Sequence, residues 1–183
     1  MEIQKLKWYQ QEAKRTCPSL GNDKLDLAHM VLGIGSETEE LYKAMLTNDS
    51  VNVLEEIIDK IWYIANYCTF RGYSLEELYN KRDSFTDEPW EANTEVEIIK
   101  FSKLQDYVKK YIAYNKPINT DLEKNALKGI LWSLDRILEQ EEFNLETGLD
   151  RNIAKLRERF PQGFSEEKAL NRNLTNERKV LEN

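Results

Sequence analysis

The chain has 183 residues, of which 40% are hydrophobic and 32% are charged, with only 7 glycines and 4 prolines. This composition favours long helices over strands and turns, and the length suits one ordinary domain. The formal net charge of −7 argues against non-specific nucleic-acid binding, which depends on clustered lysine and arginine. No apolar run approaches the roughly 20 residues that span a membrane. We expect an all-α protein that binds neither nucleic acid nor membrane.

The two cysteines indicate the cellular compartment in which we expect the protein. Cys17 and Cys68 lie far apart without a CxxC motif, and no apolar N-terminal run resembles a signal peptide. Because disulfides persist mainly in oxidising compartments, we expect two free thiols and a cytoplasmic location.

Hydrophobic periodicity and capping residues divide the chain into predicted helices. In chain order, the expected helices are 2–15, 23–46, 51–70, 75–82, 95–115, 120–142 and 149–159. Residues 84–94 lack periodicity, and 144–148 have the composition of a loop. The final twenty residues are charged and predict one more helix with a frayed end.

Two pairs of carboxylates stand out on the second and third predicted helices. Glu37 and Glu40 form one pair, and Glu56 and Asp59 form the other. Both pairs have i, i+3 spacing, so each projects from one helix face. Four acids that converge repel one another, and a bound cation explains their co-occurrence. Oxygen ligation suits Mg²⁺, with Mn²⁺ as an alternative, so we predict a magnesium site.

The neighbours of the first pair argue against a merely solvated face. Met30, Gly33 and Ala44 share the face of Glu37, where a solvated helix would carry lysine or arginine. A di-iron bundle is an alternative, but it needs Glu-x-x-His pairs, and His29 is the single histidine and lies outside any such pair. We expect His29 to be a hydrogen-bonded structural residue.

Five segments carry a family resemblance. Residues 35–41 (GSETEEL) and 55–63 (EEIIDKIWY) resemble the E-x-x-E and E-x-x-D signature of the MazG-like all-α nucleoside triphosphate pyrophosphohydrolases. Residues 152–161 (NIAKLRERFP) resemble a segment near the end of that family's core. Further matches are 9–13 (YQQEA) with Thr16 near the start, and 29–33 (HMVLG) before the first acids. The resemblance covers about 8–80 and 148–175.

The resemblance implies a four-helix core formed by 1–83 and 146–183, with a C-terminal tail helix. The chain departs from the family pattern at Glu39, where glycine is usual, and at 84–145, which resembles an inserted helical hairpin. The hairpin is either a peripheral or interface addition, or a lid over the ligand.

The resemblance also implies an activity. It is the hydrolysis of a (d)NTP between the α and β phosphates to a (d)NMP and pyrophosphate. Glu37, Glu40, Glu56 and Asp59 would hold Mg²⁺ and form the catalytic set, in which either Glu40 or Glu56 activates the attacking water.

Four further residues are candidates for substrate binding. Lys155, Arg159 and Asn152 share one helix face and are placed to contact phosphate oxygens, although a solvated helix end is the simpler explanation of the two cations. For the nucleobase, Trp62 or Trp8 is the candidate, although Trp62 also suits a core position.

The resembling proteins are dimers or tetramers with sites near subunit contacts, so a homodimer or homotetramer is expected. The basic tail, with Arg172, Arg178 and Lys179, either closes over phosphates of a neighbouring subunit or is simply solvated. Two other functions stay open: a nucleotide-binding protein that sequesters its ligand without turnover, and a structural helical adaptor.

Overall fold

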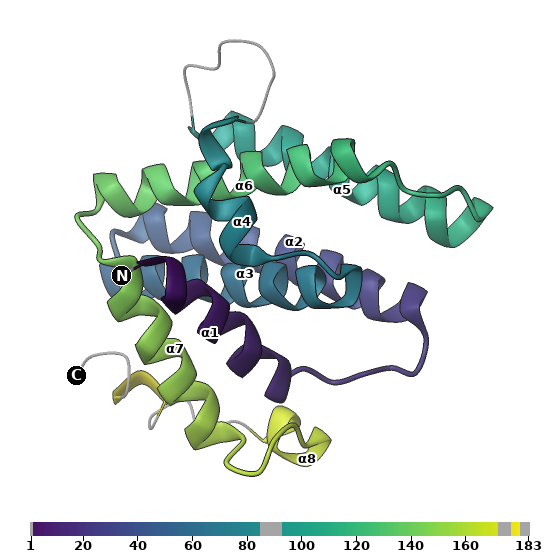
Figure 1. The fold of residues 1–183 in the computed structure, drawn as a ribbon. Coiled ribbons are helices and arrows are strands. Elements are labelled where there is room, and N and C mark those ends of the chain that lie inside the picture. Colours follow the sequence, from purple (N-terminus) through teal and green to yellow (C-terminus); the bar gives the residue numbers. More distant parts are fainter. Residues whose placement is uncertain (1, 85–92, 172–176, 180–183) are drawn as a thin grey trace.

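The computed structural model describes residues 2–84, 93–171 and 177–179, whose regular elements are all helical (Figure 1). The elements are α1 (Glu2–Arg15), α2 (Asp23–Thr47), α3 (Ser50–Arg71), α4 (Leu75–Asn80), the 3₁₀ turn η1 (Arg82–Ser84), α5 (Asn93–Tyr114), α6 (Thr120–Gln140), α7 (Leu145–Arg159) and α8 (Glu166–Leu170). The all-α prediction is confirmed. None of these helices is long and apolar enough to cross a membrane.

Caps at both ends define α2 and α3. The Asn22 side chain accepts hydrogen bonds from the first backbone amides of α2, and Asn48 ends that helix in the left-handed region at φ 55°. Asp49 then caps the start of α3, which ends at Gly72 with φ 66°. Because only two residues separate the two helices, they run antiparallel and side by side (Figure 1). This arrangement brings the two acid pairs to the same level.

The last core helix begins earlier than the sequence suggested. The predicted loop at 144–148 is wrong, because Asn144 caps a helix that already starts at Leu145. Gly148, which we had interpreted as a loop residue, lies in the first turn of α7. A Cβ atom at this position would lie 2.8 Å from Ile58 Cγ1, so the glycine permits close packing of α7 on α3.

Two other predicted segments are described only in part. Most of the irregular stretch 84–94 lies outside the described residues, and α5 begins at Asn93. In the final twenty residues, α8 and a helical turn at 177–179 are described. The rest of that tail, including Arg172, lies outside the part of the chain that the structure describes.

The helices form three layers, with α2 and α3 in the middle (Figure 1). Helices α1 and α7 cover one side, and the hairpin of α5 and α6 covers the other. The buried apolar residues of all three layers form one hydrophobic cluster, to which the hairpin contributes Leu104, Leu127 and Ile130. The hairpin is therefore part of the core and not a peripheral addition. Its status as an insertion between 1–83 and 146–183 stays a prediction.

Buried acids of α6 anchor the hairpin to α3 in the middle layer and to η1. The fully buried Glu123 accepts hydrogen bonds from Arg71 at 2.8 and 2.9 Å and from Tyr67. Asp135 is paired with Arg82 at 2.8 Å. Since a buried carboxylate is costly without such partners, these contacts specify how the hairpin docks.

Candidate functional site

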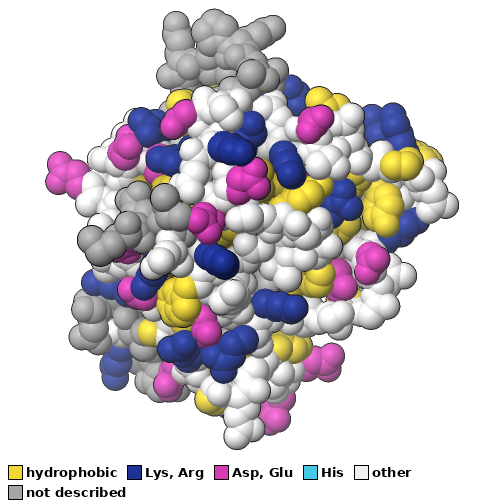
Figure 2. Space-filling model, viewed as in Figure 1, with side chains coloured by type: hydrophobic (Ala, Val, Ile, Leu, Met, Phe, Trp, Pro, Cys, Tyr) yellow, Lys and Arg dark blue, Asp and Glu magenta, His cyan; other side chains and the backbone are white. Residues whose placement is uncertain are grey.

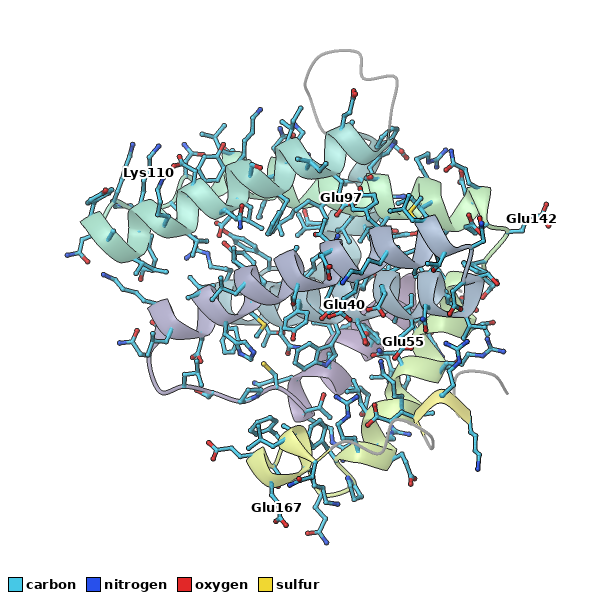
Figure 3. The ribbon with its side chains drawn as sticks, turned by 180° about the vertical axis from the view of Figure 1, so that it is seen from behind. Glu40, Glu55, Glu97, Lys110, Glu142 and Glu167 are labelled. Atoms are coloured by element: carbon cyan, nitrogen blue, oxygen red, sulfur yellow. The ribbon has the colours of Figure 1, made fainter. Side chains whose placement is uncertain are left out.

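Three of the four predicted acids converge between α2 and α3. Glu37 from α2 and Glu56 and Asp59 from α3 are half-buried, and one carboxylate oxygen from each lies within 4.8 Å of the others. We call these three residues the acidic cluster. Glu40 lies one turn further along α2 and is exposed, on the same side of the molecule as Glu55 (Figure 3). The structure thus brings together only three of the four predicted acids. The charge of Glu40 still contributes to raising the pKa values of Glu37 and Glu56.

The acidic cluster retains protons when no cation is present. Burial, with the charges of Asp59 and Glu56, raises the pKa of Glu37 to about 9. Burial also raises the pKa of Glu56 to about 7, while its hydrogen bond with Glu37 acts in the opposite direction. Glu37 therefore stays protonated at neutral pH and donates a hydrogen bond to the Glu56 carboxylate. A divalent cation would displace this proton and satisfy the same oxygens.

Two of the predicted substrate-binding residues contact the acidic cluster directly. Lys155 is 1% exposed, and its Nζ lies 2.5 Å from Asp59 Oδ2 and 2.9 Å from Glu55 Oε1. Asn152 donates to the other oxygen of Asp59 and accepts a 2.8 Å hydrogen bond from the Tyr9 hydroxyl. Both residues thereby fix the orientation of the Asp59 carboxylate. Whether they also contact phosphate stays a prediction.

Sequence reasoning missed Glu55 and Tyr9 as members of this network. Glu55 and Asp59 are spaced i, i+4, so both face α7, where Lys155 lies between them. That spacing was a usable signal for Glu55. Tyr9 begins one of the segments that resemble the family, but the resemblance assigned it no role. Its contact with Asn152 joins residues that are 143 positions apart, so no local pattern could predict it.

A cleft of about 310 Å³ adjoins the acidic cluster. Its wall combines acids, bases and aromatic rings, namely Glu37, Asp59, Lys155, Arg159, His29, Trp62, Tyr63, Phe160 and Phe164. Trp62 is 8% exposed, contacts Tyr63 edge to face at 4.9 Å between ring centroids, and donates a 3.1 Å hydrogen bond to Thr16 Oγ1. Trp62 is therefore both a core residue and part of the cleft wall.

Arg159 also lines the cleft, and its guanidinium is held by the C-terminal segment. Arg159 Nε lies 2.8 Å from Glu177 Oε1, and a second nitrogen contacts Oε2 of the same carboxylate. The neighbouring Arg178 contacts Asn52 near the start of α3. Trp8, the other candidate for the nucleobase, lies under Lys5 at 4.4 Å and is not among the residues that line this cleft.

The histidine has a different environment from the one we expected. His29 is half-buried in the cleft wall, with Tyr63 at 6.0 Å between ring centroids. Its Nδ1 atom has no hydrogen-bond partner among the described residues, so the expectation of a hydrogen-bonded structural histidine is wrong for this nitrogen. Burial lowers the pKa of His29, which keeps the ring neutral at physiological pH.

No family model, curated protein or solved structure matches this chain. The MazG-like resemblance therefore depends on the matching sequence segments alone, chiefly the two acid motifs and the segment from Asn152 to Pro161. The carboxylate oxygens of the acidic cluster suit a divalent cation. The basic and aromatic side chains of the adjoining cleft suit an anionic ligand that carries an aromatic ring.

Proposed function

We propose that this protein is a Mg²⁺-dependent nucleoside triphosphate pyrophosphohydrolase with a MazG-like four-helix core and an inserted hairpin. The observation that carries this proposal is the convergence of Glu37, Glu56 and Asp59 beside a cleft with aromatic and basic walls. An acidic cluster alone is common on protein surfaces. Here the cluster is half-buried, and burial together with repulsion between its carboxylates keeps a proton on Glu37. A bound cation would replace that proton and neutralise the repulsion.

The residues fit Mg²⁺, with Mn²⁺ as an alternative. Glu37, Glu56 and Asp59 would hold the ion, and the exposed Glu40 would reach it directly or through water. When bound, Mg²⁺ neutralises triphosphate charge and lowers the pKa of a bound water. The protein's own part is to orient Asp59 through Lys155 and Asn152 and to accept the proton of the attacking water at Glu56 or Glu40.

The cleft supports a nucleotide as the substrate. Its volume of about 310 Å³ lies at the lower end of the range of small-molecule sites. Trp62 and Tyr63 offer apolar ring surface for a base, and Lys155 and Arg159 offer positive charge for phosphates. Glu177 holds Arg159 in the ligand-free protein, so a phosphate would have to share or replace that carboxylate.

We also propose a homodimer or homotetramer. Leu25 and Leu32 of α2 are 52% and 70% exposed, and Ile112 of α5 is 36% exposed beside them. Ile112 and Leu32 line an open groove between the two helices. Figure 2 shows the opposite face of the molecule, on which apolar side chains are interspersed with lysine, arginine and acidic ones. The exposed apolar groove between α2 and α5 favours association.

Product analysis tests the proposed activity. The protein is incubated with Mg²⁺ and a panel of dNTPs, NTPs and guanosine polyphosphates in heavy-oxygen water, and the products are separated by ion exchange. We expect monophosphate and pyrophosphate in equal amounts, with the label in the monophosphate. Glu37→Gln should abolish turnover. Glu39→Gln is the matched control on the same helix, because Glu39 is exposed and paired with the exposed Lys43.

Three results would count against the proposal. Release of orthophosphate would indicate cleavage at the γ phosphate instead. Tight nucleotide binding without turnover would favour a sequestering protein. Binding of neither metal nor nucleotide, together with no effect of Glu37→Gln or Asp59→Ala, would favour a structural adaptor.

A further inference from the structure

The guanidinium of Arg159 is already bound by a carboxylate of the same chain. Arg159 lies in the last turn of α7 and lines the cleft beside the acidic cluster. Its Nε atom donates a 2.8 Å hydrogen bond to Glu177 Oε1, and its Nη2 atom contacts Oε2 of the same carboxylate. Both side chains are largely buried. A two-point pair between charged groups, shielded from water, is stronger than an exposed ion pair.

The segment that carries Glu177 also contacts α3. We call the described residues 177–179 the strap. The guanidinium of Arg178 donates a hydrogen bond to Asn52 Oδ1 in the first turn of α3. Asn52 lies four residues before Glu56, so the two side chains share one face of that helix. In Figure 3 the strap is the short yellow turn beside α7, on the side of the molecule where Glu55 is labelled. The strap therefore links the end of α7 to the start of α3.

A carboxylate and a phosphate make the same contacts with arginine. The guanidinium presents parallel N–H donors that fit two oxygens of either group. In Arg159, the pair of donors formed by Nε and Nη2 is filled by the two oxygens of Glu177. A phosphate that shared this guanidinium would be held close to a second anion, and the two would repel each other. Replacement of the carboxylate is therefore more favourable than sharing.

We propose that the strap is an autoinhibitory element, in which the Glu177 carboxylate competes with a ligand phosphate for Arg159 and is released when the ligand binds. This inference rests on the proposed binding of a nucleotide phosphate at Arg159, and it does not depend on hydrolysis. The contact of Arg178 with α3 helps to hold the strap closed. If the strap is closed in about nine molecules out of ten, the apparent affinity for a phosphate ligand falls about tenfold.

Two other roles of the strap predict different results. A strap that only fixes the C-terminal segment in place would leave the affinity for phosphate unchanged when Glu177 is replaced. A strap that closes over bound ligand would weaken that affinity when its contacts are removed. Competition predicts the opposite, because loosening the strap frees the guanidinium of Arg159 and strengthens binding.

Calorimetric titration of the full chain with inorganic pyrophosphate, in a buffer that contains Mg²⁺, tests the competition. We expect Glu177→Gln to bind pyrophosphate about tenfold more tightly than the parent protein. Arg159→Met should bind it about tenfold more weakly, because the cation is lost. In the double variant Arg159→Met/Glu177→Gln, loss of Glu177 should change the affinity of Arg159→Met by no more than about twofold.

Two further variants separate competition from a general effect of charge. Arg178→Met removes a positive charge, which by itself weakens the binding of an anion. Because this change also removes the contact of the strap with Asn52, we expect about threefold tighter binding of pyrophosphate. Glu158→Gln is the control for loss of an acid, since Glu158 is exposed and adjoins Arg159 in α7. It should bind pyrophosphate as the parent does.

Unchanged or weaker binding in Glu177→Gln or in Arg178→Met overturns the competition. A gain in Glu158→Gln equal to that in Glu177→Gln also overturns it, because the effect would then be one of net charge. In either case, hydrolysis of a triphosphate by the parent protein leaves the proposed function standing. Absence of pyrophosphate binding overturns the inference, and absence of both binding and hydrolysis overturns the proposed function as well. If Glu177→Gln does not fold, the direction of the change in Arg178→Met decides.

Discussion

Replacing Glu37 with glutamine should stabilise the metal-free protein at alkaline pH. Since burial raises the pKa of Glu37 to about 9 from an ordinary value of 4.5, the folded state binds a proton that the unfolded state releases. Stability is therefore lost as the pH rises from about 4.5 toward 9. At about pH 8 the upper limit is about 4.8 kcal/mol, and sharing of the proton with Glu56 reduces the expected gain to about 2–4 kcal/mol. The amide can still donate to Glu56 but cannot ionise.

Urea unfolding in EDTA measures this gain. At about pH 5, Glu37→Gln and the parent should agree within about 1 kcal/mol, and the difference should appear by about pH 8. Saturating Mn²⁺ at about 100 times its Kd should add about 2.7 kcal/mol to the parent and none to the variant. Glu39→Gln should behave as the parent does. Equal stability of Glu37→Gln and the parent at both pH values would refute the shared proton.

Two further substitutions test the surroundings of the site, and a third tests the anchor of the hairpin. Lys155→Met should lower the free energy of unfolding in EDTA by about 2–3 kcal/mol, because Asp59 loses its buried counter-ion, and it should abolish hydrolysis. Calorimetry without such a loss would contradict the pairing. Gly33→Ala should cost about 1–3 kcal/mol, since its Cβ would lie 2.1 Å from the Tyr63 ring, and near-ultraviolet circular dichroism should report a moved tyrosine. Glu123→Gln should cost about 2–3 kcal/mol in urea unfolding; an unchanged midpoint would show that the hairpin does not depend on this anchor.

Helices were predictable from local signals, and the error at 144–148 shows where such signals fail. Helix ends are often marked by residue types that cap a helix or adopt the left-handed region. Here Asn22 caps α2 with its side chain, and Asn48 and Gly72 end α2 and α3 with positive φ angles, so these ends can be located from the sequence. Gly148 has the same composition signal but a tertiary cause. Its missing side chain makes room for Ile58 of α3, which no local pattern reveals.

The acidic cluster was predictable only to the level of a helix face. The two members of an i, i+3 pair differ by about 60° around the helix axis, so one can face a partner helix while the other is exposed to solvent. In α2, Glu37 faces α3 and Glu40 is exposed. In α3, Glu56 contacts Glu37, whereas Asp59 contacts Asn152 and Lys155 on α7. The rotation of each helix about its axis is set by packing.

The role of the hairpin was not predictable from the sequence. Glu97 of α5 and Lys60 of α3 form a buried ion pair although they are 37 residues apart, and neither carries a local signal for burial. A charged residue usually indicates a solvated position, and only docking of α5 on α2 and α3 places both charges in the interior. The sequence therefore indicated a helical hairpin, but it did not reveal that the hairpin packs as part of the hydrophobic core.

Calorimetric titration of the parent protein with Mn²⁺ tests the divalent site most directly. At about pH 7.5, in buffers with different ionisation enthalpies, the account predicts one saturable Mn²⁺ site that releases about one proton per ion, because the cation displaces the proton shared by Glu37 and Glu56. Saturable binding without proton release would refute the shared proton. Absence of Mn²⁺ uptake would contradict the site itself and the hydrolytic function proposed for it.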